Sequence, residues 1–349
     1  MRAYKERGGD VAAVLPIHYP RALLRAFDIL PVEVWGPPGI DASPGAAHLQ
    51  AYVCCIVQNA LSFLLAGGLD VADILVVPHA CDSLQGLGSI LTDFITPEQP
   101  VLPIYLPRGR RESDVDFLAG EFRSLYHRLE AITGRSPSSA DLLASIRREE
   151  QADELLSELH RRRGSLSLLD RDFYCLVRSR EYVPAETFVE LAQGMLAHAT
   201  DVPQAGARVP IILSGILPEP MSLLEAVSDM GGVIVADDLA CCGRRLYAPG
   251  ESEEPFCRMA ESMVHAPPDS TRGNPIQERL EHLLRLVETS GARGVVFYVV
   301  KFCEPELFDL PDLRKGLEAE GVSSLVIETD LGESHQVITR LQAFVEMLR

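Results

Sequence analysis

The feature that most constrains this chain is a short apolar run, Ile-Leu-Val-Val, at residues 74–77. Runs of this kind, rich in β-branched residues, are typical of strands that are buried on both faces of a parallel sheet. Pro78 ends the run, and Cys81, Asp82 and Ser83 follow it. In open α/β sheets, ligands bind at the carboxyl ends of the strands. The loop after this strand is therefore a candidate functional site.

A second stretch near the C-terminus repeats the arrangement, because Cys303 follows another apolar run at residues 294–300. Further strand-like runs lie at 11–15, 30–35, 101–107, 209–213, 233–236 and 324–330. They alternate with helical patterns at 20–26, 47–66, 86–94, 221–230, 277–290, 312–320 and 336–348. This alternation predicts an α/β protein with doubly wound, Rossmann-like or flavodoxin-like parallel sheets.

The chain is too long for one small domain, since it has 349 residues. We expect an N-terminal α/β domain at 1–205, which includes a helical section at about 112–198, and a C-terminal α/β domain at 206–349. Residues 201–208 resemble a linker. Within the helical section, the Arg161–Arg163 run is expected to lie on a solvated face, and Cys175 to pack in the core.

Charge and hydropathy restrict the partners and the location of the protein. The formal net charge is −18, whereas nucleic acids and anionic membrane surfaces demand a basic face. The apolar runs fall far short of the ~20 residues that span a bilayer. No long apolar segment follows the charged N-terminus, so we expect a cytoplasmic protein without a signal peptide.

The cysteines indicate a metal site rather than disulfides. A disulfide framework is not expected in a cytoplasmic chain. No Cys-x-x-Cys pair occurs, which argues against zinc ribbons, ferredoxin-type loops and thioredoxin-like sites. Any metal site must therefore be assembled by the fold from distant segments. The eight cysteines are at positions 54, 55, 81, 175, 241, 242, 257 and 303.

Three thiolates form the most suggestive set. Cys81 or Cys303 alone is better explained by core packing, because free cysteine is among the most buried residue types. A third cysteine at a helix N-terminus, Cys54 or Cys55, changes this balance, since a helix N-terminus stabilises a thiolate. Adjacent helical residues diverge by about 100°, so only one of this pair can face a shared site. Three thiolates and one open position suit an iron–sulfur cluster.

A rival group lies at the end of another predicted strand. Cys241 and Cys242 are adjacent there, with Asp237, Asp238 and Arg245 as polar neighbours that either orient a ligand or cap the loop.

Other side chains near Cys81 are candidate catalytic groups. His79 is a candidate acid or base, although a histidine that hydrogen-bonds the loop backbone is the commoner case. Asp82 and Ser83 are weaker candidates for the same site. No Gly-rich dinucleotide fingerprint or phosphate-binding loop follows any of the strands. We therefore expect energy or electrons to come from another protein.

Several segments form a characteristic set in this order, namely Cys54-Cys55-Ile-Val-Gln58 and residues 76–83, 236–245, 301–311, 327–330 and 339–348. With these segments the chain resembles the subunits of 2-hydroxyacyl-CoA dehydratases and benzoyl-CoA reductases, the family of the 2-hydroxyglutaryl-CoA dehydratase D-component. Residues 54–58 correspond to the family's early Cys-Ser-x-x-Lys/Arg helix start, with Gln58 in place of the usual basic residue.

The resemblance implies two α/β domains with a [4Fe-4S] cluster held between them by Cys54, Cys81 and Cys303. Cys55 and Cys241 are the alternative ligands. It also implies a homologous partner subunit, an acyl-CoA substrate and a separate ATP-dependent activator that delivers one low-potential electron. In the dehydratases this electron gives a ketyl radical from which the hydroxyl group leaves, and in the reductases it starts the reduction of an aromatic ring.

Two other interpretations stay open at this point. The chain is an electron-relay or structural subunit without substrate chemistry of its own, or the extra cysteines help to hold a double-cubane cluster.

Overall fold

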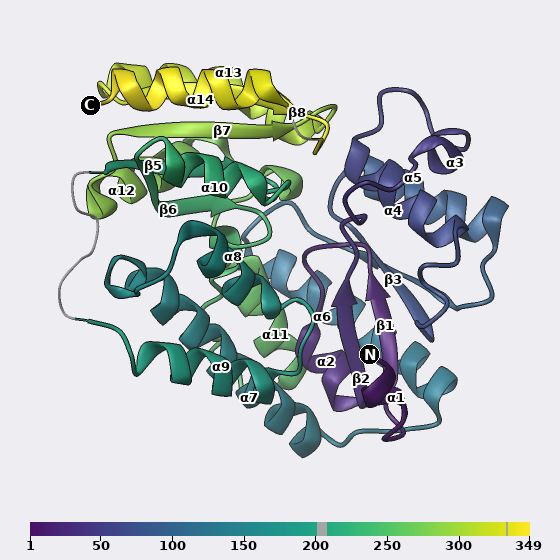
Figure 1. Cartoon of the computed structure of the whole chain (residues 1–349). Helices are drawn as coiled ribbons and strands as arrows, with labels where there is room; N and C mark the ends of the chain where they lie inside the picture. Colours follow the sequence, from purple (N-terminus) through teal and green to yellow (C-terminus); the bar gives the residue numbers. More distant parts are fainter. Residues whose placement is uncertain (201–207, 333) are drawn as a thin grey trace. The chain divides into compact units, whose positions relative to one another are not determined.

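The structure is a computed structural model that describes residues 1–200, 208–332 and 334–349 (Figure 1). The predicted domain boundary and almost all of the predicted linker lie outside the described residues. The chain divides into two compact units. Unit 1 comprises Met1–Glu154, Arg180–Phe188 and Tyr247–Ala266, and unit 2 comprises Leu155–Ser179, Val189–Leu246 and Pro267–Arg349.

Unit 1 contains a four-stranded, all-parallel sheet of the kind predicted from the sequence. The strand order is β2-β1-β3-β4. After β2 the chain returns past β1 to form β3, so the carboxyl ends of β1 and β3 mark the point at which the winding reverses, where such sheets bind ligands. The strands are β1 (Asp10–Val14), β2 (Ile29–Glu33), β3 (Ile74–His79) and β4 (Val101–Tyr105).

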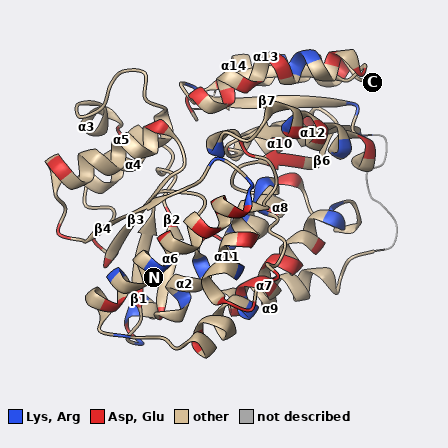
Figure 2. Ribbon diagram, turned by 180° about the vertical axis from the view of Figure 1, so that it is seen from behind, with Lys and Arg blue, Asp and Glu red and all other residues tan. Residues whose placement is uncertain are grey.

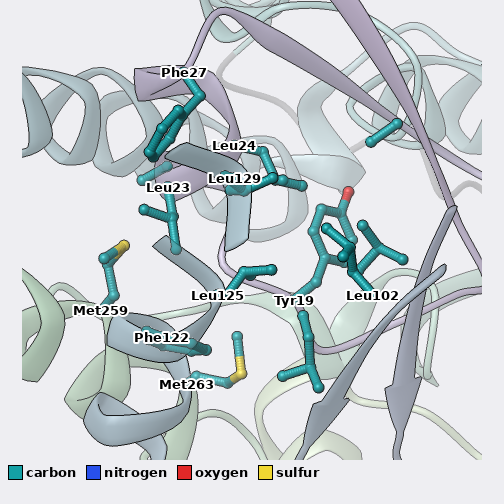
Figure 3. Packing of buried hydrophobic residues seen from close by; sticks show 14 of the residues in the cluster. Tyr19, Leu23, Leu24, Phe27, Leu102, Phe122, Leu125, Leu129, Met259 and Met263 are labelled. Atoms are coloured by element: carbon teal, nitrogen blue, oxygen red, sulfur yellow. The ribbon is translucent and has the colours of Figure 1, made fainter. Parts of the chain in front are cut away.

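Helices bury both faces of this sheet, and alternate residues of each strand supply the two faces. On one face Val14, Val76 and Ile104 pack against α2 (Arg21–Ala26), α6 (Glu112–Thr133) and α11 (Pro255–Val264). Figure 3 shows the labelled side chains of this core, which include Leu23, Leu24, Phe122, Leu125, Leu129, Met259 and Met263. Other helices that begin in unit 1 are α1 (Arg2–Lys5), α3 (Ser43–Ala46), α4 (Cys55–Leu65), α5 (Asp82–Ile90), α7 (Ser139–Arg161) and α9 (Ala185–Leu196). A π-helical turn at Leu91–Ile95 extends α5.

Unit 2 contains a second all-parallel sheet with the equivalent strand order, β6-β5-β7-β8. Its strands are β5 (Val209–Gly215), β6 (Gly232–Leu239), β7 (Gly294–Val300) and β8 (Ser323–Thr329). Alternate residues of β7, namely Val295, Phe297 and Val299, pack in the core with Leu283 and Leu317. The predicted fold class, two doubly wound parallel sheets with a helical section, is confirmed.

Helices cover both faces of this second sheet as well (Figure 1). The helices α10 (Ser222–Asp229) and α14 (His335–Met347) contact each other, and so do α12 (Ile276–Ser290) and α13 (Glu304–Ala319). The helical section also includes α8 (Asp170–Ser179) and α9 (Ala185–Leu196).

Three of the predicted helix starts are wrong. The helix predicted over 86–94 begins four residues earlier, at Asp82. The helix predicted over 47–66 begins only at Cys55, because Cys54 has an extended backbone (φ −61°, ψ 147°) and caps the helix. The helix predicted over 312–320 begins much earlier, at Glu304. Pro305 suits its first turn, and the helix continues through Pro311, a residue type that disfavours helix interiors.

The surface predictions for the helical section also need correction. Arg163 is buried, and its Nη2 lies 2.8 Å from Asp170 Oδ1 while its guanidinium lies 4.1 Å from the centre of the Phe173 ring. Cys175 is exposed instead of packed in the core. The reason is helical periodicity, because Phe173, Tyr174 and Val177 occupy the buried face of α8.

Charged residues of both signs lie on α7, as Figure 2 shows. Within the described ranges, no helix combines the length and the apolar character that crossing a bilayer would need.

Candidate functional site

Cys54 lies at the N-cap of α4. Its side chain is buried, and burial raises the pKa of the thiol. The nearby backbone amides of Val57 and Ile56 and the hydroxyl of Ser83 favour the thiolate and lower the pKa of Cys54 in part. The sulfur therefore faces the first turn of its own helix and the side chain of a residue on α5.

Cys81 lies at the N-cap of α5, two residues beyond the end of β3, with an extended backbone (φ −138°, ψ 169°). Burial raises the pKa of its thiol to about 12, and the proximity of Cys54 adds to this rise. The backbone amides of Leu84 and Ser83 act in the opposite direction. The fold of unit 1 thus brings Cys54 and Cys81 together, each at the positive end of a helix.

Cys303 occupies the same position in unit 2, at the N-cap of α13 and three residues beyond the end of β7. It is 8% exposed. The residue before it, Phe302, has a left-handed backbone (φ 62°) that non-glycine residues rarely adopt. Such strain is found where the surrounding structure fixes a functional loop.

All three cysteines predicted as ligands are therefore helix N-caps, a position at which Ser, Thr, Asp and Asn are the usual residues. Free backbone amides and the helix dipole favour a thiolate over a thiol at this position. Thiolate is the ligand that iron–sulfur clusters require, so the donor chemistry fits such a cluster. Among the described residues, no group of three His, Cys, Asp or Glu side chains is arranged to hold a metal ion. The structure itself thus establishes a pair of thiols in unit 1.

The other predicted side chains lie around this pair in different ways. His79 packs edge-on against Tyr105, with ring centroids 4.7 Å apart, and neither buried ring nitrogen has a hydrogen-bond partner. Burial lowers its pKa, so the imidazole is neutral at pH 7. Asp82 is exposed and lies 3.7 Å from Arg108. Cys55 is the first residue of α4 and is half-buried.

The rival pair, Cys241 and Cys242, is buried in unit 2, and the two sulfur atoms lie 3.4 Å apart. Asp237 shapes this loop, because its Oδ1 accepts a hydrogen bond from the backbone amide of Gly243 (2.7 Å). A Cβ atom at Gly243 would lie 2.1 Å from the Asp237 carbonyl oxygen, so only glycine fits there.

The sequence did not indicate a buried polar network around Arg244 in unit 2. Asp237, Asp238 and Arg245 were predicted only as polar neighbours of the two cysteines, and the structure pairs Asp238 with Arg244. Glu306 belongs to the same network. Glu306 lies three residues after Cys303. An acidic residue three positions after a helix cap is a known pattern, and it was the signal in the sequence that could have pointed to Glu306.

Comparison with known proteins agrees with these features. The chain matches the family described as 2-hydroxyglutaryl-CoA dehydratase, D-component, over residues 16–348. It is 28% identical to the beta subunit of lactoyl-CoA dehydratase from Anaerotignum propionicum and 26% identical to the beta subunit of (R)-phenyllactyl-CoA dehydratase from Clostridium sporogenes. Each alignment covers 100% of this chain and 94% of the relative.

A further relative extends the similarity from dehydratases to a reductase. The chain is 26% identical to one of the subunits of benzoyl-CoA reductase from Thauera aromatica, over 87% of this chain and 81% of the relative. The relatives are thus subunits of acyl-CoA dehydratases and of an acyl-CoA reductase, and the chain described here belongs to the 2-hydroxyglutaryl-CoA dehydratase D-component family.

Proposed function

We propose that this chain is the iron–sulfur subunit of a 2-hydroxyacyl-CoA dehydratase or of a related acyl-CoA reductase. Cys54, Cys81 and Cys303 would hold a [4Fe-4S] cluster. The observation that carries the proposal is that all three cysteines are N-caps of helices that follow or precede a strand of a parallel sheet. Cysteine is uncommon as a cap, and three such caps are not needed by the fold itself.

The protein groups around the thiols would hold the cluster in a defined setting. The amides of the first turns of α4 and α5 would stabilise the thiolates of Cys54 and Cys81. Ser83 would donate a hydrogen bond to the Cys54 sulfur, and hydrogen bonds to sulfur tune the reduction potential of such clusters. When bound, a [4Fe-4S] cluster with three thiolate ligands supplies one-electron chemistry and leaves one iron open to an acyl-CoA carbonyl or to water. Catalytic roles of His79 and Asp82 stay predictions.

The partners follow from the relatives. Because those proteins are named as individual subunits of their enzymes, we propose that this chain assembles with a homologous subunit. The electron would come from a separate ATP-dependent activator, which agrees with the lack of a phosphate-binding loop in the sequence.

The test is anaerobic purification with iron and sulfide analysis. We expect about four irons per chain, as one cubane requires. Replacing Cys54, Cys81 or Cys303 by Ser should lower the iron content and weaken the cluster absorption, whereas Cys175→Ser, which removes an exposed thiol on α8, should leave the iron content unchanged. An iron-free wild-type chain that keeps its native fold would overturn the proposal.

One observation favours a second candidate, a double-cubane cluster. The close approach of Cys241 and Cys242, at 3.4 Å, provides two further thiols. About eight irons per chain, with iron lost in Cys241→Ser, would support this alternative.

Binding of an acyl-CoA to the isolated holoprotein separates a catalytic subunit from an electron relay. A catalytic subunit should bind the thioester, whereas a relay subunit should bind it only when its partner is present.

A further inference from the structure

Arg244 is completely buried and makes a forked contact with Asp238 at the end of β6. Its Nε donates to Asp238 Oδ1 and its Nη2 donates to Asp238 Oδ2, both at 2.9 Å. A bidentate contact of this kind fixes the plane and the direction of a guanidinium. The remaining nitrogen, Nη1, is thereby aimed at a second carboxylate.

That second carboxylate is Glu306, whose Oε1 accepts from Arg244 Nη1 at 2.5 Å. Glu306 is the third residue of α13, the helix that Cys303 caps. An acidic residue at this position commonly turns back to the cap and accepts a hydrogen bond from its backbone amide. Here the carboxylate is held by Arg244, by the hydroxyl of Ser270 and by Arg279 Nη2 at 3.7 Å instead.

Arg279 of α12 completes the network from the other side. It reaches Asp309 Oδ2 at 2.7 Å and Asp238 Oδ2 at 3.3 Å. The first two turns of α13, which contain Glu306 and Asp309, are thus tied to β6 and α12 by two buried guanidinium groups.

A network of this kind is a poor way to gain stability, because several charges must leave water for each contact that forms. Its geometry is more informative. The contacts converge on the first turn of the helix whose cap is Cys303, and they come from elements that are distant in sequence.

We propose that Arg244 and Glu306 act as positioning residues that hold the first turn of α13, and hence the sulfur of Cys303, in place for cluster binding. The inference rests on the proposed function for the cluster itself. Neither residue is a ligand, and both act through the helix.

The experiment compares three variants of the full-length chain. Arg244→Lys keeps the positive charge but cannot make the bidentate contact of a guanidinium with Asp238. Glu306→Gln keeps the shape of the side chain but removes its negative charge. The matched control is Arg163→Lys, which removes another buried guanidinium of unit 2, the one that contacts Asp170 on α8. Thermal unfolding of all three reports the general loss of stability.

The first measurement uses iron-free protein and follows alkylation of Cys303 relative to Cys81 by peptide mass spectrometry. We expect Arg244→Lys and Glu306→Gln to raise the Cys303 rate about tenfold through local opening of the first turn. The control should leave the ratio unchanged.

The second measurement uses reconstituted protein. The same two variants should bind iron about 10- to 100-fold more weakly, the usual effect of losing a group that orients a ligand. They should also change the reduction potential and the electron paramagnetic resonance spectrum of any cluster that remains. A further variant, Glu306→Asp, keeps the negative charge and should bind iron more tightly than Glu306→Gln.

The outcomes separate this inference from the proposed function. If the two variants only lower the unfolding temperature, as the control does, and leave the Cys303 ratio and the spectrum unchanged, then the network merely stabilises the fold and the inference is wrong. If the wild-type chain binds no iron, the cluster proposal fails, and the alkylation ratio still decides whether Arg244 and Glu306 position Cys303.

Discussion

The two units have equivalent strand orders but position their helix-capping cysteines differently. In each unit the third strand, β3 or β7, is followed by a cysteine that caps the next helix. In unit 1 the helix that leads into β3 also begins with a thiol, Cys54. In unit 2 the helix that leads into β7 begins after Pro275. Unit 1 therefore offers two neighbouring thiols that cap helices, and unit 2 offers one capping thiol, Cys303, beside a buried charge network.

One topology can thus supply a site in two ways. In unit 1 the two thiols are fixed by local features, their own cap positions and the hydroxyl of Ser83. In unit 2 the capping thiol, Cys303, lies at the start of a helix that distant side chains hold, chiefly Arg244 and Arg279. Changes in the two units should therefore have different consequences.

Loss of the thiol pair in unit 1 should have the strongest consequence. The double variant Cys54→Ser/Cys81→Ser should lower iron binding by more than about 100-fold, because it removes two ligands where the usual effect of a supporting residue is already 10- to 100-fold. Cys303→Ser, which removes one ligand, should have a smaller effect and leave some loosely bound iron. Iron analysis after anaerobic gel filtration checks this order, and equal iron loss in the two variants would contradict the contrast between the units.

The next effect concerns the charge network. Asp238→Asn leaves two buried guanidinium groups without their shared carboxylate, and the free energy of unfolding should fall by about 3–5 kcal/mol. Unit 1 offers a comparison in Glu149, a buried carboxylate that contacts Arg180. Glu149→Gln should cost a similar amount. Only Asp238→Asn should expose Cys303 to alkylation, and a similar exposure in both variants would show that general destabilisation is the cause.

The sequence predicted the sheets better than it predicted the surroundings of the thiols. The run at 74–77 is buried and β-branched, and a local pattern of this kind is sufficient to identify a strand. The caps at Cys81 and Cys303 were not predicted, because cysteine is not a typical cap. Helix starts depend on the backbone angle of a single residue, which periodicity does not report.

The sequence did not predict the charge network, for a different reason. Its members come from β6, α12, α13 and the 3-10 turns at Gly243–Arg245 and Ser270–Arg272. No local pattern in the sequence shows that Arg244, the middle residue of the first turn, is the completely buried one that pairs with Asp238. Long-range ion pairs of this kind emerge only when the strands and helices are placed in space.

A smaller effect is expected in the pH dependence of stability. Burial raises the pKa of Asp238, but the charges and hydrogen bonds of Arg244 outweigh this and lower the pKa to about 2. The folded pKa therefore lies below the unfolded value of 3.8, so the carboxylate stabilises the protein fully above about pH 4 and loses this contribution as the pH falls through 2. The stability advantage of the wild type over Asp238→Asn should shrink by about 2 kcal/mol between pH 5 and pH 2. Denaturant unfolding of both proteins at several pH values measures this difference in the free energy of unfolding. A difference that stays constant with pH would be inconsistent with a lowered pKa of Asp238.

The weakest consequence is expected at Phe302, the strained residue before Cys303 (φ 62°). Glycine adopts this conformation without the ~1–2 kcal/mol cost that a Cβ atom adds, but it loses about 0.5–1 kcal/mol through the greater freedom of the unfolded chain. Phe302→Gly should therefore change the free energy of unfolding by less than about 1 kcal/mol, in the stabilising direction.

The position before Cys81 supplies the contrast in unit 1, because Ala80 has no such backbone strain and Ala80→Gly should only destabilise. Denaturant unfolding of both variants checks the two signs. If Phe302→Gly destabilises as strongly as Ala80→Gly, the left-handed backbone at Phe302 carries no cost, and the loops that present the two thiols differ only in length.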